Sequence, residues 1–568
     1  MSENSNLIFK KRYAINEEET WEQLSVRVGA GGAQVETDFK KWTDEFAADI
    51  FNMRFLPGGR ILRNVGRPRG TLFNCYVEPL EDSMRQIGLF QMNCGVLWSE
   101  GGGVGCNASF LRPENAPIIQ KGGESSGPIS FLKWANAGAN CIKTGGSRRA
   151  AALAMMNVSH PDIIKFINAK LVDGELNCFN ISVGVIEEFL EAVEEDGKWN
   201  LTWKNKTWNT VRAREIWDLI LSNMVNVAEP GLINWDNLRS NNSYYFDPII
   251  STNPCGEVPL GGHGVCCLGS LVLPNFITGS RNTNWQLMEK TVHSSVRFLD
   301  NIIQINRYVI DDIKQKAFDG RRIGLGIMGL AEYLFTKEVK YGSPEANRVI
   351  SRLMENIRNY AYDASIKLAE EKEPFPKFDT KEYSKAHFIK SLPVPLRRAI
   401  KKHGIRNVTI MAVAPTGTIS LLPEVTSSIE PLPFKAYMRH DEVSDRAYIH
   451  PIYQKIIINN EKTPDWYVDS TDLSPQDHFE TQVNIQKYLD GAVSKTINCP
   501  KGFKAEQLSE LLLEYIRDLK GVTLYVDGSR EGQILNPITK KEAKKYLNEG
   551  KIIEEQIEQE CATGTCEV

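Results

Sequence analysis

The chain of 568 residues lacks any long apolar run, because no uninterrupted stretch approaches the ~20 residues that a helix needs to span a bilayer. Its first residues, MSENSNLIFKKRY, lack the apolar core of a signal peptide. It also lacks an excess of one charge, with 67 basic and 71 acidic side chains. This balance disfavours a nucleic acid or an anionic membrane as a partner. We therefore expect a cytoplasmic protein.

Histidine is scarce, and none of the 8 histidines has HExxH or another paired metal-ligand spacing. We therefore expect no histidine-built metal centre. The 11 cysteines are an odd number scattered through a large chain, which does not fit a secreted disulfide framework. In a reducing compartment most of them are expected to be buried as small hydrophobic side chains. This expectation covers Cys94, Cys106, Cys141, Cys178, Cys267 and Cys499.

Hydrophobic periodicity divides the chain into three parts. Residues 1–65 predict an N-terminal helical region, in which Phe46, Ile50 and Met53 share one helical face. From 66 to 536, glycine-rich turns and short apolar strands alternate with helices, which favours an α/β architecture. Residues 537–568 are rich in lysine and glutamate and predict a flexible C-terminal tail.

Three segments of the middle part have clear patterns. Residues 186–197, IEEFLEAVEEDG, have apolar residues at helical spacing and end in Gly197, a helix stop. VTIMAVA (408–414) and VTLYV (522–526) are short, apolar and rich in β-formers, so they predict buried strands.

The run Asn253-Pro254-Cys255-Gly256-Glu257 places a thiol two residues from a carboxylate and two from an amide. Pro254 and Gly256 disfavour a regular helix or a central strand. In an extended loop alternate side chains project to one face, so Asn253, Cys255 and Glu257 are expected to address one bound molecule. A thiol, a base and an amide on one face predict sulfur chemistry on a hydroxylated substrate.

Further cysteines accompany this run. Cys75 lies in TLFNCYVEPLEDSM and Cys266 in GVCCLGSL, while Cys561 and Cys566 lie in the final ECATGTCEV. A mobile dithiol tail suits an enzyme whose internal dithiol is oxidised in each turnover and reduced by exchange. The alternative is a zinc pair, but no nearby histidine or second cysteine pair completes four ligands within the chain.

Residues 416–420 of APTGTIS follow the predicted strand 408–414 and present backbone N–H groups together with hydroxyls. This arrangement predicts a phosphate-binding loop, and its alternative is an ordinary strand-to-helix turn.

Gly324, Gly326 and Gly329 spell G-x-G-x-x-G, the pattern of a dinucleotide-binding loop. That fingerprint requires a strand directly before it, whereas the preceding DDIKQKAFDGRR is polar and helix-like. We therefore interpret these glycines as sites of close packing.

Together these segments resemble the catalytic subunit of ribonucleotide reductase. The ordered set comprises FLPGGRIL, NCYVEPLEDSM, GGGVG, LRPENAPI, SSGPISF, IKTGGSRRAAA, NPCGE, CCLGSL, RRIGLGIMGLAE, APTGTIS, TSSIEP and GVTLYVDGSR, and it covers most of the chain. The resemblance implies a ten-stranded α/β barrel of two five-stranded parallel halves that run antiparallel to each other. It also implies a central finger loop and the reduction of ribonucleoside di- or triphosphates to 2′-deoxyribonucleotides.

The resemblance also implies a role for each residue of the NPCGE run. Cys255 becomes a transient thiyl radical that takes the hydrogen from C3′ of the ribose. Glu257 accepts the proton of the 3′-hydroxyl as general base, and Asn253 holds the ribose hydroxyls. A thiyl radical needs a closed pocket that excludes water, which a barrel interior provides.

For the other cysteines the resemblance implies redox roles. Cys75 and Cys266 supply the two reducing equivalents and end as a disulfide. Cys266 is preferred over Cys267 because the family's pattern is cysteine, one residue, then Leu-Gly-Ser. Cys561 and Cys566 pass on reducing equivalents from a thioredoxin- or glutaredoxin-type reductant.

Two nucleotide sites are implied as well, one for the substrate and one for a nucleoside triphosphate effector, whose pocket a homodimer contact builds. The substrate residues are Asn74, Thr416, Gly417, Thr418, Ile419 and Ser420. The effector residues are Asp82, Ser83, Met84, Arg112, Lys143, Arg148 and Arg149.

The source of the radical divides the family. In LYVDGSR, Tyr525 is present, but Val526 stands where two-subunit enzymes carry a second relay tyrosine. This difference favours the adenosylcobalamin-dependent form. The alternative is the large subunit of a two-component reductase that takes its radical from a metal-bearing small subunit. A hypothesis of another class is a nucleotide sensor without activity, against which the complete set of cysteines argues.

Overall fold

The computed structural model describes the chain except for residues 120–121, 145–147, 173, 441–444, 530–534 and 549–568. Its N-terminal region is helical, as the sequence predicts, and Thr20 begins one helix with a capping box. The helices of this region are α1 (Glu3–Ile8), the π-helix η1 (Phe9–Tyr13), α2 (Trp21–Ala33), α3 (Phe39–Phe51) and α4 (Gly59–Asn64). Phe46 and Ile50 are buried on α3. The placement of Met53 on the same helical face is wrong, because α3 ends at Phe51 and Met53 has a left-handed φ of 48°.

A mixed sheet of ten strands forms the centre of the molecule. Its strands are β1 (Phe55–Pro57), β2 (Cys75–Val77), β3 (Gly103–Asn107), β6 (Ala152–Asn157), β7 (Phe179–Val185), β10 (Gly231–Asn234), β13 (Gly264–Val272), β14 (Ile323–Met328), β17 (Thr496–Cys499) and β18 (Gly521–Val526). They lie in the order β1-β13-β2-β3-β6-β7-β10-β18-β17, and β14 pairs with β13.

This sheet contains two sets of parallel strands, and the first set is contiguous. Strands β2, β3, β6, β7 and β10 are parallel to one another. In the second set β13 is parallel to β14, and β17 is parallel to β18. The two sets meet in antiparallel pairs, β2 with β13 and β10 with β18.

The segment 408–414 lies between β14 and β17. Single parallel bridges join Met411 to Leu325 of β14 and Val413 to Val493, which precedes β17. The segment is buried as predicted. It therefore continues the second set of strands by isolated bridges.

Two predicted strands differ in detail from the structure. Residues 408–414 form no continuous ladder, because the N–H groups of Ile410 and Met411 donate to the Asp490 carboxylate over 2.7 and 2.8 Å. Strand β18 is present, but its side chains alternate between buried and more accessible positions, and Thr523 is exposed. That strand has one open face.

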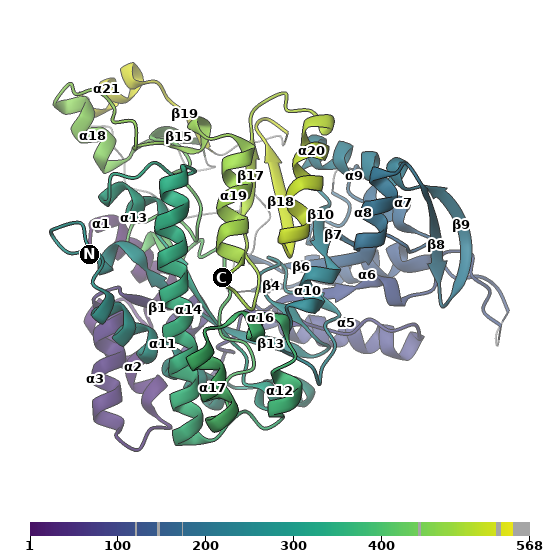
Figure 1. The fold of residues 1–568 in the computed structure, drawn as a ribbon, viewed down its shortest axis with the longest axis horizontal. Helices are drawn as coiled ribbons and strands as arrows, with labels where there is room; N and C mark the ends of the chain where they lie inside the picture. The colour runs from purple at the N-terminus through teal and green to yellow at the C-terminus, as the bar shows by residue number, and fades with distance from the viewer. Residues whose placement is uncertain (120–121, 145–147, 173, 441–444, 530–534, 549–568) are drawn as a thin grey trace.

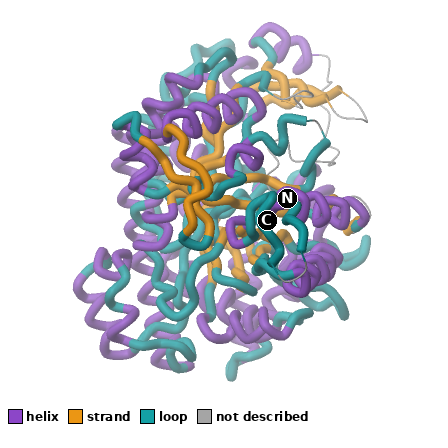
Figure 2. The backbone as a smooth tube through the Cα atoms, turned by 90° about the vertical axis from the view of Figure 1, so that its right-hand side faces the viewer, coloured by secondary structure: helices purple, strands orange, loops and turns teal. Residues whose placement is uncertain are grey.

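Helices surround the sheet, as Figures 1 and 2 show. They are α5 (Met84–Ser99), α6 (Gly127–Cys141), α7 (Ile163–Ile167), α8 (Glu187–Glu194), α9 (Ala213–Val227), α10 (Trp235–Ser240), α11 (Trp285–Ile305), α12 (Asp311–Gly320), α13 (Leu330–Thr336), α14 (Pro344–Lys372), α15 (Thr380–Tyr383), α16 (His387–Ser391), α17 (Val394–His403), α18 (Pro451–Ile458), α19 (Pro475–Gln486) and α20 (Ala505–Tyr515). Helix α8 confirms the helix predicted over 186–197, with Phe189, Leu190 and Val193 buried. In the described part of the chain no helix is both long and apolar enough to cross a membrane.

Smaller sheets lie outside the central one. The two-stranded sheets are β4 (Lys143–Thr144) with β5 (Arg148–Arg149), β8 (Lys198–Trp203) with β9 (Lys206–Arg212), and β11 (Ser251–Thr252) with β12 (Pro259–Leu260). A three-stranded sheet joins β16 (Asp445–Ile449), β15 (Ala436–His440) and β19 (Leu535–Pro537).

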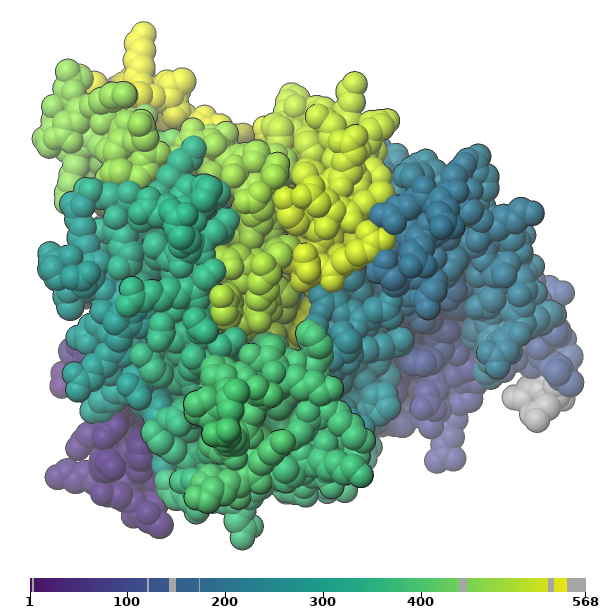
Figure 3. Space-filling view, viewed as in Figure 1, coloured from purple at the N-terminus to yellow at the C-terminus, as the bar shows by residue number. Residues whose placement is uncertain are grey.

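The predicted flexible tail begins with a packed helix. Residues Lys540–Asn548 form α21, which buries Ala543 in a small core shared with α18. Both helices stand out at the top left of the surface in Figure 3. The prediction of a mobile arm directly after 537 is wrong, because an apolar contact on one helical face outweighs the charged composition. Cys561 and Cys566 lie outside the described residues.

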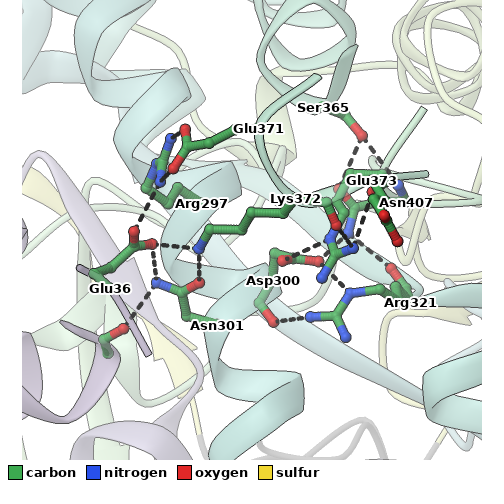
Figure 4. Close-up of polar contacts among 12 residues, drawn as sticks. Glu36, Arg297, Asp300, Asn301, Arg321, Ser365, Glu371, Lys372, Glu373 and Asn407 are labelled. Atoms are coloured by element: carbon green, nitrogen blue, oxygen red, sulfur yellow. Dashed lines mark hydrogen bonds and ion pairs between the residues drawn. The ribbon is translucent and has the colours of Figure 1, made fainter. Parts of the chain in front are cut away.

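A buried polar network ties the N-terminal region to the body (Figure 4). Glu36, which follows α2, accepts hydrogen bonds from Arg297 (2.9 Å), Asn301 (2.7 Å) and Lys372 (2.6 Å). Arg297 and Asn301 lie on α11, and Lys372 ends α14. One carboxylate thus holds three elements together.

The second centre of this network is Asp300 on α11. Its carboxylate accepts hydrogen bonds from Arg321 (2.7 Å), Asn407 (2.9 Å) and Arg406 (3.2 Å). Arg321 has the left-handed backbone φ of 47° that ends α12, directly before β14. The network therefore fixes the point at which β14 begins.

The interpretation of the G-x-G-x-x-G glycines as packing sites is confirmed. Gly324 and Gly326 lie inside β14, and helix α12 precedes them. A Cβ on Gly326 would lie 2.5 Å from the carbonyl oxygen of Ala412. Gly329 begins α13 with a φ of 75°, which favours glycine.

The expectation that six cysteines are buried holds for five of them. Cys141 is the exception, since it lies exposed at the last residue of α6. The buried residues are Cys94, Cys106, Cys178, Cys267 and Cys499.

Candidate active site

The NPCGE run forms a tight turn between β11 and β12. The Asn253 side chain closes this turn, because its Oδ1 accepts the N–H of Val258 over 2.9 Å. The N–H of Gly256 donates to the carbonyl of Asn253 over 3.0 Å, and the φ of Gly256 is 81°. The expected extended loop is therefore wrong. The turn of the backbone, and not the alternation of side chains along an extended strand, brings the side chains of this run together.

A sulfur atom from another strand meets this turn. The amide Nδ2 of Asn253 donates to the Sγ of Cys75 on β2 over 3.3 Å. The same sulfur lies 4.0 Å from Oε1 of Glu257. All three side chains are buried. The Cys75 thiol of one motif thus lies in contact with the amide and the carboxyl of the NPCGE run.

Cys266 lies beside Cys75. The two are direct partners in the antiparallel pairing of β13 with β2. Opposite residues in such a pair have Cα atoms about 4.5–5.5 Å apart, which falls inside the range that a disulfide spans. Half-buried Cys255 packs against the cluster of buried residues that contains both cysteines. Cys267, the next residue of β13, belongs to a different cluster.

The buried carboxyl of Glu257 has few hydrogen-bond partners among the described residues. Burial raises its pKa to about 7, against the opposing effect of a hydrogen bond with Asn253. Its Oε2 has no hydrogen-bond partner among the described residues. A carboxyl with a pKa near neutrality can accept a proton at physiological pH, as a general base must.

The thiol of Cys266 is held in its protonated form. Burial raises its pKa well above the ordinary range, although the charge of Arg322 acts in the opposite direction. A thiol can donate a hydrogen atom, which a thiolate cannot.

A pocket opens beside Cys255. Thr252, Pro254 and Gly256 of the turn contribute to its wall. Polar side chains from β7, β18 and the segment before β17 also line it, namely Asn180, Ser182, Ser494, Lys495 and Thr523. A molecule bound here would lie against Cys255.

The predicted phosphate-binding loop is a compact turn. The N–H of Ser420 donates to the carbonyl of Thr416 over 3.0 Å, and Thr416 has a φ of 56°. A Cβ on Gly417 would meet nothing within 4 Å, so that side of the loop is open. The loop leads into the short 3-10 helix η4 (Ile419–Leu421) and not into an α-helix.

Two buried hydroxyls at this loop lack partners among the described residues, Thr418 Oγ1 and Ser428 Oγ. The N–H of Ser428 donates to Oγ1 of Thr416 over 2.7 Å. Ser428 lies in TSSIEP, which carried part of the resemblance but was not predicted as a site residue. The side-chain Oδ1 of Asn74, beside Cys75, is likewise buried without a described partner.

The residues predicted for an effector fall into two groups. Asp82 accepts hydrogen bonds from the backbone N–H and the Nε of Arg112, while Ser83 begins α5 as its N-cap and Met84 is exposed. Lys143, Arg148 and Arg149 form the β4–β5 pair, and their side chains lie outside the described part. Within the described residues no group of three potential metal ligands occurs.

Comparison with protein families gives two matches that together span most of the chain. The ribonucleotide reductase all-alpha domain matches residues 1–70, and the ribonucleotide reductase barrel domain matches residues 73–525. The boundary between them agrees with the step from the helical region to the sheet.

Several curated proteins are similar along most of their length. A vitamin B12-dependent ribonucleoside-diphosphate reductase of Mycobacterium tuberculosis (strain CDC 1551 / Oshkosh) is 33% identical over 94% of this chain and 80% of its own. A protein of the same description from Thermoplasma acidophilum is 32% identical over 93% and 72%. A ribonucleoside-diphosphate reductase subunit alpha from Chlamydia trachomatis is 26% identical over 86% of this chain and 51% of its own.

Proposed function

Because the chain belongs to the ribonucleotide reductase family, we propose that it reduces ribonucleoside di- or triphosphates to 2′-deoxyribonucleotides by thiyl-radical chemistry. One observation carries this proposal. The Asn253 amide and the Glu257 carboxyl both lie against the sulfur of Cys75, with Cys266 opposite and Cys255 in the same turn.

We propose that the sheet closes into a ten-stranded barrel around this turn, which acts as its finger loop. The two parallel sets with antiparallel junctions support this arrangement. The bridges of Met411 to Leu325 and of Val413 to Val493 support closure, because they link β14 towards β17. Segment 408–414 then serves as a tenth barrel strand, and β1 lies outside the ring.

In the proposed reaction the Cys255 thiyl radical takes the hydrogen atom from C3′ of the ribose. Glu257 accepts the proton of the 3′-hydroxyl, for which its pKa of about 7 suits it. The Asn253 amide orients the ribose hydroxyls. The 2′-hydroxyl then leaves as water, and the burial of Glu257 and Asn253 keeps solvent from the reacting carbons.

Cys75 and Cys266 close the balance of the reaction. Together they give up two hydrogen atoms, two protons with two electrons, and form a disulfide. These equivalents replace the C2′–OH bond by C2′–H and yield one water. Cys255 returns its hydrogen atom to C3′ and Glu257 returns its proton to the 3′-oxygen, which restores the thiyl radical. The phosphates of the substrate are assigned to residues 416–420, where Thr418 has a hydroxyl without a described partner.

We assign adenosylcobalamin as the cofactor. When bound, it supplies the radical equivalent that Cys255 receives. The pocket at Cys255, with polar walls that include Asn180, Ser182 and Thr523, would hold its reactive end. The vitamin B12-dependent relatives support this choice, as does buried Val526 in place of a second relay phenol after Tyr525.

The test combines the purified chain with adenosylcobalamin, a ribonucleotide and a small dithiol. We expect turnover without a second protein. Turnover only after addition of a metal-bearing small subunit would favour the two-component alternative. The similarity to the Chlamydia subunit alpha is the reason for testing this alternative. Nucleotide binding without any dithiol oxidation would identify a sensor.

The C-terminal cysteines are proposed to re-reduce the internal pair with electrons from a thioredoxin- or glutaredoxin-type protein. The Cys561→Ser, Cys566→Ser variant should stop after about one cycle with a protein reductant and continue with a small dithiol. Undiminished turnover with thioredoxin would remove the tail from the scheme. We place the protein in the reducing cytoplasm, where such thiol pairs are kept available for exchange.

We further propose a homodimer with an effector nucleotide at Asp82, Ser83, Met84 and Arg112. Helix α5, which Ser83 begins, exposes the apolar side chains of Met84, Leu89, Met92 and Val96, and a second copy would cover them. Sedimentation of the Met92→Glu variant should give monomer where the parent chain gives dimer. Identical sedimentation of both would exclude this surface.

A further inference from the structure

Strand β14 has no side chains on one of its faces around Cys266. Its residues Gly324 and Gly326 alternate with the buried apolar residues Ile323, Leu325 and Ile327. This side-chain-free face is turned towards neighbouring strands, because added Cβ atoms there would meet their atoms.

Gly324 touches the redox site directly. A Cβ at this position would lie 3.1 Å from the sulfur of Cys266, closer than most real Cβ contacts. It would also lie 2.5 Å from Cδ2 of Leu268 and 3.2 Å from Cβ of Ala412. The sulfur of reduced Cys266 therefore rests over the space that Gly324 leaves open.

This resting place lies on the far side of Cys266 from its redox partner. Strand β13 pairs with β14 on one edge and with β2 on the other. Cys75 belongs to β2, while Gly324 belongs to β14. A disulfide requires its two sulfurs about 2.05 Å apart, so the Cys266 sulfur must turn from the β14 side towards β2 when the pair is oxidised.

We infer that Gly324 is a positioning residue, whose missing side chain provides the site where the reduced Cys266 thiol rests and from which it turns towards Cys75. The inference rests on the proposed function, in which these two thiols lose two protons and two electrons to the ribose. It adds that the strand next to the redox pair sets the balance between thiol and disulfide.

The position of Gly324 is itself fixed. Arg321, three residues earlier, is bound to the buried carboxylate of Asp300 (Figure 4). The side chain of Arg322 donates to the carbonyl of Pro259 over 2.8 Å. The hydrogen bonds of these two buried arginines hold the beginning of β14 in place. A movement of β14 away from the sulfur would break these hydrogen bonds.

The test is a redox titration of the Cys75–Cys266 pair in the full chain. Cys561→Ser and Cys566→Ser are present throughout, so that only the internal pair exchanges. Dithiothreitol buffers set the potential, and thiol alkylation with mass spectrometry reads the fraction oxidised. In Gly324→Ala the added methyl group crowds the reduced thiol and leaves the disulfide unaffected. We expect the equilibrium to shift about tenfold towards disulfide, a potential about 30 mV more negative.

Two controls separate the sulfur contact from general packing. Gly262→Ala lies just before β13, where its Cβ would meet neighbours at an ordinary 3.6 Å, and it should leave the potential unchanged. Gly324→Ala with Leu268→Val removes the leucine clash and leaves the sulfur contact. The shift in potential should persist in this double variant while the melting temperature recovers.

An unchanged or more positive potential in Gly324→Ala would overturn the inference, as would loss of the shift in the double variant. Should Gly324→Ala fold poorly, the melting temperature is measured with and without Gly324→Ala in a Cys266→Ala chain, which lacks the sulfur. Gly324→Ala should lower the melting temperature less in that chain than in the chain that keeps Cys266. An equal loss in both would contradict the inferred contact between residue 324 and the sulfur. Absence of any Cys75–Cys266 disulfide in the parent chain would contradict the proposed function itself.

Discussion

Glu257 and Asp300 are both carboxyl groups hidden from solvent, yet the protein surrounds them in opposite ways. Asp300 accepts hydrogen bonds from two arginines and one asparagine. Glu257 is hydrogen-bonded with Asn253, and one of its oxygens lacks a partner in the described part of the chain. The same type of group is saturated at one place and left open at the other.

Their protonation differs accordingly. Burial by itself raises the pKa of either group, but at Asp300 the charges of Arg321 and Arg406 outweigh burial and lower it. At Glu257 no cation among the described residues opposes burial, and the pKa rises to about 7. A saturated buried carboxylate is an anchor, whereas an open one is available for chemistry.

The largest expected effect comes from Cys255, the thiol in the same turn as the open carboxyl. Cys255→Ser should lower the turnover rate by a factor of about 10⁴ or more, because a hydroxyl cannot replace the hydrogen-abstracting sulfur. Nucleotide binding and the melting temperature should stay near those of the parent chain. Cys141→Ser, at the exposed cysteine of α6, is the matched control and should remain active. Residual turnover within tenfold of the parent would remove Cys255 from its role.

Glu257→Gln comes next and tests the open carboxyl itself. The amide keeps the shape and loses the base, so the turnover rate should fall by about 10²–10⁴. Its free energy of unfolding at pH 8 should equal or exceed that of the parent, because a buried charge has been removed. Full activity in this variant would show that Glu257 takes no proton.

Asp300→Asn should give the reverse outcome. It leaves Arg321 and Arg406 buried without their counter-ion, and the free energy of unfolding should drop by about 3–5 kcal/mol. Turnover per folded molecule, measured well below the melting temperature, should stay within about tenfold. Denaturant unfolding measures the free energy of unfolding, and an activity assay on the same preparation measures the turnover. A stable but inactive variant would reverse the roles assigned to the two carboxyls.

The smallest effect is the pH dependence of stability, and its sign distinguishes the two groups. Glu257 has a raised pKa when folded, so the folded chain binds its proton more tightly than the unfolded chain. Stability from this group is complete below the ordinary pKa of 4.5 and is lost as the pH rises to about 7, on the order of 3 kcal/mol. Asp300 acts oppositely, with stability present above its ordinary pKa and lost as the pH falls through its lowered value.

The difference in unfolding free energy between the parent and Glu257→Gln, measured from pH 4 to pH 8, isolates the first effect. It should move in favour of the glutamine variant as the pH rises. A difference that is independent of pH would mean that folding does not shift the pKa of Glu257.

Much of the site is readable from the sequence because its chemistry is local. Asn253, Cys255 and Glu257 stand within five residues of one another, and their contact partner Cys75 lies in its own motif. The shape of the turn was missed because it depends on which N–H the Asn253 side chain accepts, a choice that composition leaves open.

Features made by distant contacts were not predictable in this way. Asp490 accepts hydrogen bonds from N–H groups of a predicted strand about 80 residues earlier. No local sequence pattern predicts this interaction. The anchoring of Arg321 by Asp300 and the position of the Cys266 sulfur over Gly324 depend on strand register. Helix α21 was missed because a single buried alanine, Ala543, is a weak signal in a charged segment.

The central claim is that the Cys75–Cys266 dithiol supplies two electrons for the reduction of a ribose that is bound against Cys255. The most direct measurement is a single turnover of the Cys561→Ser, Cys566→Ser chain with adenosylcobalamin and a ribonucleotide, without external reductant. We expect one deoxyribonucleotide per chain and, by peptide mass spectrometry, one new disulfide between Cys75 and Cys266. Deoxyribonucleotide formed while both thiols stay reduced, or a disulfide that joins other cysteines, would contradict the account.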